Sequence, residues 1–245
     1  MSNMQHLQGK AALVLGGSRG IGAAIARRLG SEGVRVALTY ATSPDKAQEV
    51  ADDIEATGTQ AIAIQADSSD ADAIRNAVEQ TFERFGRLDI VVVNAGVLTL
   101  GPIDAIALDD LDRALAVNVR GVFLAIQAAQ ARMGQGGRII TIGSNTANHA
   151  SPGSSVYAMT KAAVAMLVRS VALDLAPRGI TVNNIQPGPT LTDMTQDLID
   201  RVLPHVPVGR VAAPSEIAGM VAYLAGDEAG YITGASLTID GGMSL

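Results

Sequence analysis

The stretch "LGGSRGIG" (residues 15–22) follows the apolar run "AALVLG" (residues 11–16) and opens a segment with helical spacing. Ile21, Ile25 and Leu29 recur at i, i+4 and i+8, which predicts one buried stripe of a helix. The turn between strand and helix contains three glycines in a G-x-x-x-G-x-G pattern, namely Gly16, Gly20 and Gly22. Such a turn lets the backbone and the helix N-terminus approach a pyrophosphate. A turn that serves only chain geometry is the alternative, and its place in a strand–helix unit makes nucleotide binding the better prediction.

Short apolar runs alternate with longer segments of helical spacing along the whole chain. Because these runs are almost entirely apolar rather than alternating, both faces of their sheet should be covered by helices. We therefore predict an α/β fold, a doubly wound (Rossmann) seven-stranded parallel sheet with helices on both faces. We expect one domain over residues 1–245. The seven predicted strands are residues 11–16, 35–40, 60–66, 89–96, 137–144, 180–188 and 235–240.

Composition excludes several classes of partner. Of the 245 residues, 48% are hydrophobic and only 17% are charged, and the net charge is -6 with no basic run. We therefore expect no nucleic acid and no anionic membrane as partner. Without cysteine, disulfides and thiolate metal sites are impossible, and three scattered histidines make any other metal site unexpected. The first ten residues lack a signal-peptide pattern and no run of eighteen apolar residues occurs, so we expect a cytoplasmic protein.

The end of the second predicted strand indicates which dinucleotide is bound. NAD-binding proteins usually have an acidic residue there to hold the ribose 2′-hydroxyl, but this strand ends in Thr39 and Tyr40. Arg19 in the glycine turn could instead pair with a 2′-phosphate, and the Thr42 and Ser43 hydroxyls could donate to it. NADP(H) is therefore favoured over NAD(H). The alternative is that Arg19 points to solvent.

Five motifs occur in the order "LGGSRGIG", "VVVNAG", Ser144, "YAMTK" and "IQPGPTLTDM". Together they resemble the single-domain short-chain dehydrogenase/reductases, in particular the 3-oxoacyl-carrier-protein reductases and related ketone and alcohol oxidoreductases. Each motif is weak alone, but the set in this order is specific. The resemblance extends from Gly9 to the C-terminal "YITGASLTIDGGM".

The resemblance implies four catalytic residues. Tyr157 would be the general acid in reduction and the base in oxidation, and Ser144 would hydrogen-bond the substrate oxygen. Lys161, one helical turn after Tyr157, would hold the nicotinamide ribose. We also expect its charge to lower the pKa of the phenol, which is near 10 unperturbed. Asn118 would position a water that links Lys161 to solvent, although a local backbone hydrogen bond is an alternative explanation for a polar residue in this helix.

Further cofactor contacts follow by motif. Asp67 resembles the acid that contacts adenine, although it could equally be an N-cap of the following helix. The complete expected set of cofactor contacts is Gly16, Ser18, Arg19, Gly20, Ile21, Gly22, Tyr40, Ala41, Thr42, Ser43, Asp67, Ser68, Asn94, Ala95, Gly96, Tyr157, Lys161, Pro187, Gly188, Thr190 and Thr192.

Departures from the family pattern indicate the substrate. Leu15 stands where a threonine that ties down the glycine turn is usual. The basic run that would dock an acidic carrier protein is reduced to Arg132, with Arg178 at the second basic position. We therefore expect a small free carbonyl or alcohol as substrate. Residues 190–212 should form an apolar flap over it. We expect His149 to be exposed.

Two other functions remain as alternatives. The first is a 3-oxoacyl-carrier-protein reductase. The second is a regulator that binds a nucleotide or signalling dinucleotide, although such a protein has no need of Ser144, Tyr157 and Lys161 together. By resemblance we expect a homotetramer or homodimer, in which the helices that contain Asn118 and Tyr157 pack against another subunit.

Overall fold

The computed structural model describes residues 7–245, so residues 1–6, which include His6 and much of the segment tested for a signal peptide, lie outside the described residues. Its centre is a seven-stranded sheet in the order β3-β2-β1-β4-β5-β6-β7, and every neighbouring pair is parallel. All seven predicted strands and the predicted α/β class are confirmed. The strands are β1 (Ala11–Leu15), β2 (Arg35–Tyr40), β3 (Ala61–Gln65), β4 (Ile90–Val93), β5 (Arg138–Ile142), β6 (Thr181–Pro187) and β7 (Ser236–Ile239).

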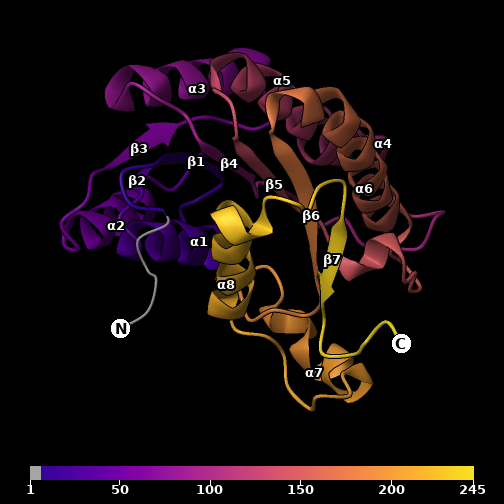
Figure 1. The fold of residues 1–245 in the computed structure, drawn as a ribbon. Coiled ribbons are helices and arrows are strands. Elements are labelled where there is room, and N and C mark those ends of the chain that lie inside the picture. Colours follow the sequence, from indigo (N-terminus) through magenta and orange to yellow (C-terminus); the bar gives the residue numbers. More distant parts are fainter. Residues whose placement is uncertain (1–6) are drawn as a thin grey trace.

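Helices cover both faces of this sheet (Figure 1). Two buried clusters separate the faces, one formed with α1, α2 and α8 and the other with α3, α5 and α6. Short 3₁₀ segments interrupt the connections after β5, α6, β6, α7 and α8. The helices are α1 (Gly20–Ser31), α2 (Pro44–Glu55), α3 (Ala71–Phe85), α4 (Leu108–Leu115), α5 (Val122–Arg132), α6 (Ser155–Leu175), α7 (Ile199–Val202) and α8 (Pro214–Ala225).

Strand β1 shows why the strands are apolar throughout. Val14 belongs to the cluster beneath α1 and α8, whereas Leu13 and Leu15 belong to the opposite cluster. Ile25 and Leu29 of α1 are fully buried, as their spacing predicted. The strand order reverses between β1 and β4, which opens a crevice at the carboxyl ends of the strands.

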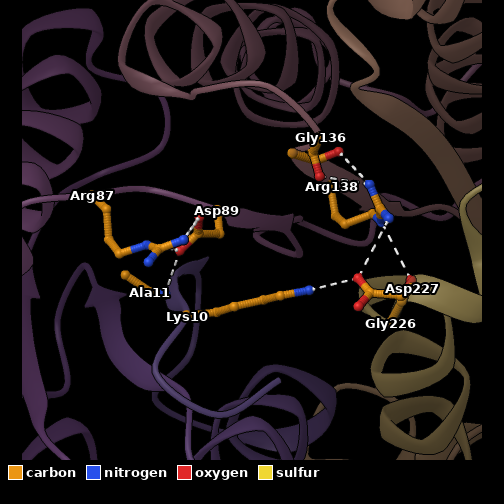
Figure 2. Close-up of polar contacts among 9 residues, drawn as sticks. Lys10, Ala11, Arg87, Asp89, Gly136, Arg138, Gly226 and Asp227 are labelled. Carbon is orange, nitrogen blue, oxygen red and sulfur yellow. Dashed lines mark hydrogen bonds and ion pairs between the residues drawn. The ribbon is translucent and has the colours of Figure 1, made fainter. Parts of the chain in front are cut away.

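Polar contacts connect segments at the amino ends of the strands, on the side of the sheet away from the crevice (Figure 2). Arg138 is buried and donates to the backbone carbonyl oxygens of Gly136 at 2.6 Å and Gly226 at 3.4 Å. Asp227 lies 3.0 Å from Lys10 and 4.0 Å from Arg138. This cluster connects the start of β5 to the end of α8, at the edge away from the crevice.

Two helical stretches, Leu108–Arg132 and Ser155–Arg178, reach the length and mean hydropathy of a membrane span. Neither stretch is an unbroken apolar run, because polar and charged residues such as Asn118 and Lys161 interrupt both. Both stretches pack on the sheet through residues such as Val122 and Val168. They also carry Asn118 and Lys161, whose polar groups are buried inside the protein.

Candidate active site

A cavity of about 490 Å³ lies where the carboxyl ends of the central strands meet. Its walls are the glycine turn, the end of β2, the segments after β4 and β5, the start of α6 and the segment after β6. This crevice gathers nearly all of the residues that the sequence marked as cofactor contacts or catalytic groups. The two that do not line it are Gly22 and Asn118.

The glycine turn requires its glycines for different reasons. Gly16 and Gly20 adopt φ values of +74° and +54°, which side chains rarely tolerate. Gly22 is required by close packing, because a Cβ there would lie 2.1 Å from the Gly16 carbonyl oxygen and 2.5 Å from Asn94 Nδ2. Asn94 Nδ2 donates to that same carbonyl at 2.8 Å, so the turn is fixed to the end of β4.

Thr39 supplies the tie that the absent threonine at position 15 would have made. The Gly16 N–H donates to Thr39 Oγ1 at 2.9 Å, and the Gly17 N–H donates to the Thr39 carbonyl at 2.9 Å. Leu15 can therefore be a core residue without loosening the turn. Sequence reasoning missed this role because strand pairing, not spacing along the chain, brings Thr39 beside Gly16.

The N-terminus of α1 is open toward the cavity. Arg19 occupies the N-cap position without a side-chain cap hydrogen bond, and the first turn contains no acidic residue. The first N–H groups and the partial positive charge of the helix are thus free to meet an anion. This arrangement fits a pyrophosphate better than a purely structural turn.

A small ion cluster lies beside the glycine turn. Arg19 Nη1 is 3.8 Å from Asp193 Oδ2, and Lys46 Nζ is 3.2 Å from the same oxygen. Arg19 is 60% exposed, and its nearest charged partner is Asp193. Neither Lys46 nor Asp193 was singled out from the sequence, because no motif links three residues on separate elements.

Asp67 is not a helix cap. Its Oδ1 accepts from the backbone N–H and the hydroxyl of Ser69, both at 2.8 Å, and the backbone bond is the main cause of its lowered pKa. Asp70 caps α3 instead, accepting from the N–H groups of Asp72 and Ala73. The N-cap alternative for Asp67 is wrong, and its carboxylate lines the cavity.

Ser144 and Tyr157 meet at the far end of the cavity. Ser144 follows β5, and its Oγ accepts from the Thr146 N–H at 3.2 Å and from Thr146 Oγ1 at 2.9 Å. Its own hydroxyl proton points to Asn145 Oδ1 at 3.5 Å. Tyr157 lies in the first turn of α6, and the Ser144 hydroxyl acts to lower the pKa of its phenol.

Burial shifts the pKa values of Tyr157 and Lys161 in opposite directions. Burial raises the pKa of Tyr157 to about 12, and the hydrogen bond with Ser144 opposes this only in part. The lowering expected from Lys161 together with the positive charge of the oxidised nicotinamide stays a prediction for the cofactor-bound enzyme. Burial also lowers the pKa of Lys161 to about 8. Its Nζ donates to the Ile142 carbonyl at 2.9 Å and lies 5.5 Å from the Tyr157 ring centroid.

Asn118 lies in a π-helical turn, Ala116–Gly121, between α4 and α5. Its Oδ1 accepts from the Val97 N–H at 2.8 Å, and its Nδ2 donates to the Val97 carbonyl at 2.9 Å and to Thr160 Oγ1 at 3.2 Å. Its side chain therefore does bond the backbone, but the bond is not local: it reaches another segment and not its own helix. Helical periodicity could not indicate the π turn, which is a feature frequent at functional sites.

The segment after β6 lies over the cavity. Thr190 forms an isolated bridge with Ala212, which brings the two ends of the predicted flap together. Met194, Leu198 and Val202 contribute apolar groups to the cavity, as the sequence suggested. His149 is exposed, also as expected.

The two basic residues considered for carrier docking are already engaged. Arg132 pairs with Glu79 at 2.7 Å. Arg178 donates to the side chain of Gln130 at 2.8 Å and to backbone carbonyls at the end of α5, including that of Met133.

Comparison with known proteins identifies the family. A family model described as Enoyl-(Acyl carrier protein) reductase matches residues 16–244. A solved short-chain dehydrogenase/reductase from Serratia marcescens is 55% identical with a TM-score of 0.96, covering 98% of this chain and 100% of that one. The chain belongs to the short-chain dehydrogenase/reductase family.

Two further relatives bear on what this short-chain dehydrogenase/reductase binds. A short-chain dehydrogenase from Burkholderia cenocepacia, solved in complex with NADP, is 48% identical with a TM-score of 0.96 and covers 98% of this chain and 100% of that one. A cyclic-di-GMP-binding biofilm dispersal mediator protein from Escherichia coli is 43% identical over 242 residues, 97% of this chain and 98% of the relative. Fold, site and relatives together make this short-chain dehydrogenase/reductase an NAD(P)-dependent oxidoreductase.

Proposed function

We propose that this chain is an NADP(H)-preferring carbonyl reductase and alcohol dehydrogenase, acting on a small carbonyl or secondary alcohol. The observation that carries the proposal is that Ser144, Tyr157 and Lys161 line the same cavity as the open glycine turn. A proton donor and an anion-binding helix start in one crevice suit hydride transfer between a dinucleotide and a carbonyl.

The cavity fits the dinucleotide at both ends. The N–H groups of α1 would hold the pyrophosphate, and Asp67 and the segment 94–96 would face the adenosine. Arg19 would pair with the 2′-phosphate. Residues after β6, from Pro187 to Thr192, would hold the nicotinamide carboxamide. The bound cofactor supplies the hydride.

Tyr157 is the proposed proton donor in reduction. With a pKa of about 12 its hydroxyl is protonated at neutral pH, so the proton is present when a carbonyl oxygen gains negative charge. The C=O double bond becomes a C–O single bond: the carbon receives the hydride, the oxygen receives the phenolic proton, and an alcohol results. Ser144 would donate its hydroxyl proton to the same oxygen as the charge develops.

Lys161 and Asn118 would support this proton transfer. Lys161 Nζ and Asn118 Oδ1 lie 3.5 Å and 3.3 Å from the position a Cβ would take at Gly96, so a side chain there would press on both. Lys161 would hold the ribose and stabilise the phenolate that remains after proton transfer. Asn118 would act by fixing Val97 and the nearby backbone. It would also position a water that links Lys161 to solvent.

The walls of the substrate end favour a small free substrate. Leu98, Leu198 and Val202 line the cavity and would contact an apolar group next to the carbonyl. Arg178 is held by Gln130, and the charge of Arg132 is partly neutralised by Glu79, which weakens this face as a dock for an acidic carrier protein. This supports a free ketone or alcohol over the 3-oxoacyl-carrier substrate.

Signalling-dinucleotide binding is the second candidate. The relative from Escherichia coli, named as cyclic-di-GMP-binding, favours it through its 43% identity. A binding protein has no use for Ser144, Tyr157 and Lys161 together in one cavity, so we place this function second. If saturating cyclic-di-GMP displaces no bound NADPH, the oxidoreductase is favoured over the binding protein.

We further propose a cytoplasmic homotetramer or homodimer of one-domain subunits, each with residues 190–212 as a flap. Exposed apolar side chains on the outer helices support assembly: Leu108, Met166 and Leu173 are 75%, 62% and 77% exposed. Covering such groups with a second copy would remove their apolar surface from water. Light scattering that shows a monomer would contradict this.

The proposal is tested by following NADPH and NADH oxidation against ketones, diketones and an acyl-carrier thioester. We expect turnover of a free ketone or diketone, faster with NADPH at subsaturating concentrations. Preference for the thioester would instead favour the carrier-protein reductase. Absence of turnover with every carbonyl, despite cofactor binding, would favour the binding protein.

A further inference from the structure

Asp193 lies on the segment after β6, yet its carboxylate faces cations from two other elements. Its Oδ2 is 3.2 Å from Lys46 Nζ, in the first turn of α2, and 3.8 Å from Arg19 Nη1, in the glycine turn. Arg19 and Asp193 line the same cavity as Thr42 and Ser43, and Lys46 lies just outside this lining. The flap thus places a negative charge between two cations.

The position of this carboxylate is set by its backbone. The Thr192 N–H donates to Thr195 Oγ1 at 3.2 Å, and the Thr195 N–H donates to the Thr192 carbonyl at 3.0 Å. The Thr192 methyl carbon would lie 3.2 Å from a Cβ at Gly20, so this turn packs directly on the glycine turn. This packing keeps Asp193 within 3.8 Å of Arg19, although both side chains are more than half exposed.

We propose that Asp193 determines how strongly this enzyme prefers NADP(H), because its carboxylate and the cofactor's 2′-phosphate compete for Arg19 and Lys46. This inference rests on the proposed NADP(H) binding. It adds Lys46 as a second cation for the 2′-phosphate and Asp193 as an antagonist of both. NADH has no 2′-phosphate and leaves the ion cluster intact.

Removing the carboxylate while keeping its size tests the competition. Asp193→Asn should tighten binding of NADPH and of the probe 2′,5′-ADP about three- to tenfold, the effect expected when two exposed ion pairs no longer compete. Binding of NADH should change by less than about twofold. The gain should shrink in 1 M KCl because exposed charges are screened there.

Asp197→Asn is the matched control. Asp197 is an exposed aspartate on the same segment, and among residues 7–245 it makes no ion pair within 4.0 Å. The control removes the same charge from the flap and should leave the NADPH-to-NADH affinity ratio unchanged. Lys46→Gln should weaken NADPH binding and reduce the effect of Asp193→Asn in the double variant.

NADPH fluorescence and calorimetry with 2′,5′-ADP give affinities without turnover. A selective gain in Asp193→Asn with no gain in Asp197→Asn supports the inference. An unchanged or lowered NADPH-to-NADH ratio, or an equal gain in both variants, overturns it. Failure of the unaltered protein to bind either dinucleotide would instead overturn the proposed function itself.

Discussion

Replacement of Lys161 by methionine should stabilise the fold at pH 7 while removing activity. Burial lowers the pKa of this amine from 10.5 to about 8. Keeping the ammonium charged inside the folded protein therefore costs about 3 kcal/mol, at ~1.4 kcal/mol for each pH unit by which the pKa moves. Methionine fills a similar volume without the charge.

Two losses reduce this gain. The hydrogen bond from Nζ to the Ile142 carbonyl at 2.9 Å disappears, which costs about 1 kcal/mol. The contact of Nζ with the Tyr157 ring, 5.5 Å from the centroid, disappears too, at a cost of about 0.5 kcal/mol. We expect Lys161→Met to raise the free energy of unfolding at pH 7 by about 1–2 kcal/mol.

The pH dependence makes the prediction sharper. Below pH 8 the amine is charged in both the folded and the unfolded chain, so the full penalty is present. Between pH 8 and 10.5 the unfolded chain binds more protons, and the stability of the unaltered protein rises with pH. The advantage of Lys161→Met should therefore decline across this range and turn into a small disadvantage above it, because the lost hydrogen bond remains.

Urea unfolding followed by far-ultraviolet circular dichroism at pH 7, 8.5 and 10 measures this difference at a fixed protein concentration. Lys46→Met is the control, because the Lys46 side chain is 56% exposed and its removal should change stability by less than about 0.5 kcal/mol at every pH. A Lys161→Met protein that is less stable at pH 7, or whose advantage does not change with pH, would refute the reasoning.

Three further substitutions test other parts of the structure. Gly22→Ala should lower the free energy of unfolding by about 2–3 kcal/mol and weaken NADPH binding at least tenfold, as measured by urea unfolding and fluorescence titration, since its methyl group would lie 2.1 Å from the Gly16 carbonyl oxygen. Asn118→Ala should cost about 2–4 kcal/mol of stability in the same unfolding assay, because both polar groups of the Val97 backbone lose their partner. Arg138→Met, at the amino ends of the strands, should cost about 2 kcal/mol of stability and so lower the thermal midpoint. It should leave kcat and KM unchanged, and altered kinetics would contradict a purely stabilising role for Arg138.

The fold was predictable because its determinants are local. Each strand is a short apolar run, and the spacing of Ile25 and Leu29 alone indicates which face of α1 is buried. The strand-to-helix glycine turn and the order of the motifs then predicted the site residues, and most of them line one cavity.

What the sequence did not indicate depends on contacts between distant segments. Thr39 ties down the glycine turn through strand pairing, and Asp193 reaches Arg19 only after the segment following β6 folds back. Burial of Tyr157, which raises the pKa of its phenol in the protein alone, could not be seen from helical spacing, because spacing reports only the nearby amine. The π turn around Asn118 replaces a regular helix that periodicity alone would predict.

The central claim is that Tyr157 donates the proton in reduction of a carbonyl. The most direct measurement compares the unaltered enzyme with Tyr157→Phe, following both NADPH oxidation with an active ketone and NADPH binding by fluorescence. We expect binding within about twofold and turnover reduced at least about 100-fold, the contribution typical of a positioned general acid. Turnover by Tyr157→Phe close to that of the unaltered enzyme would contradict the account.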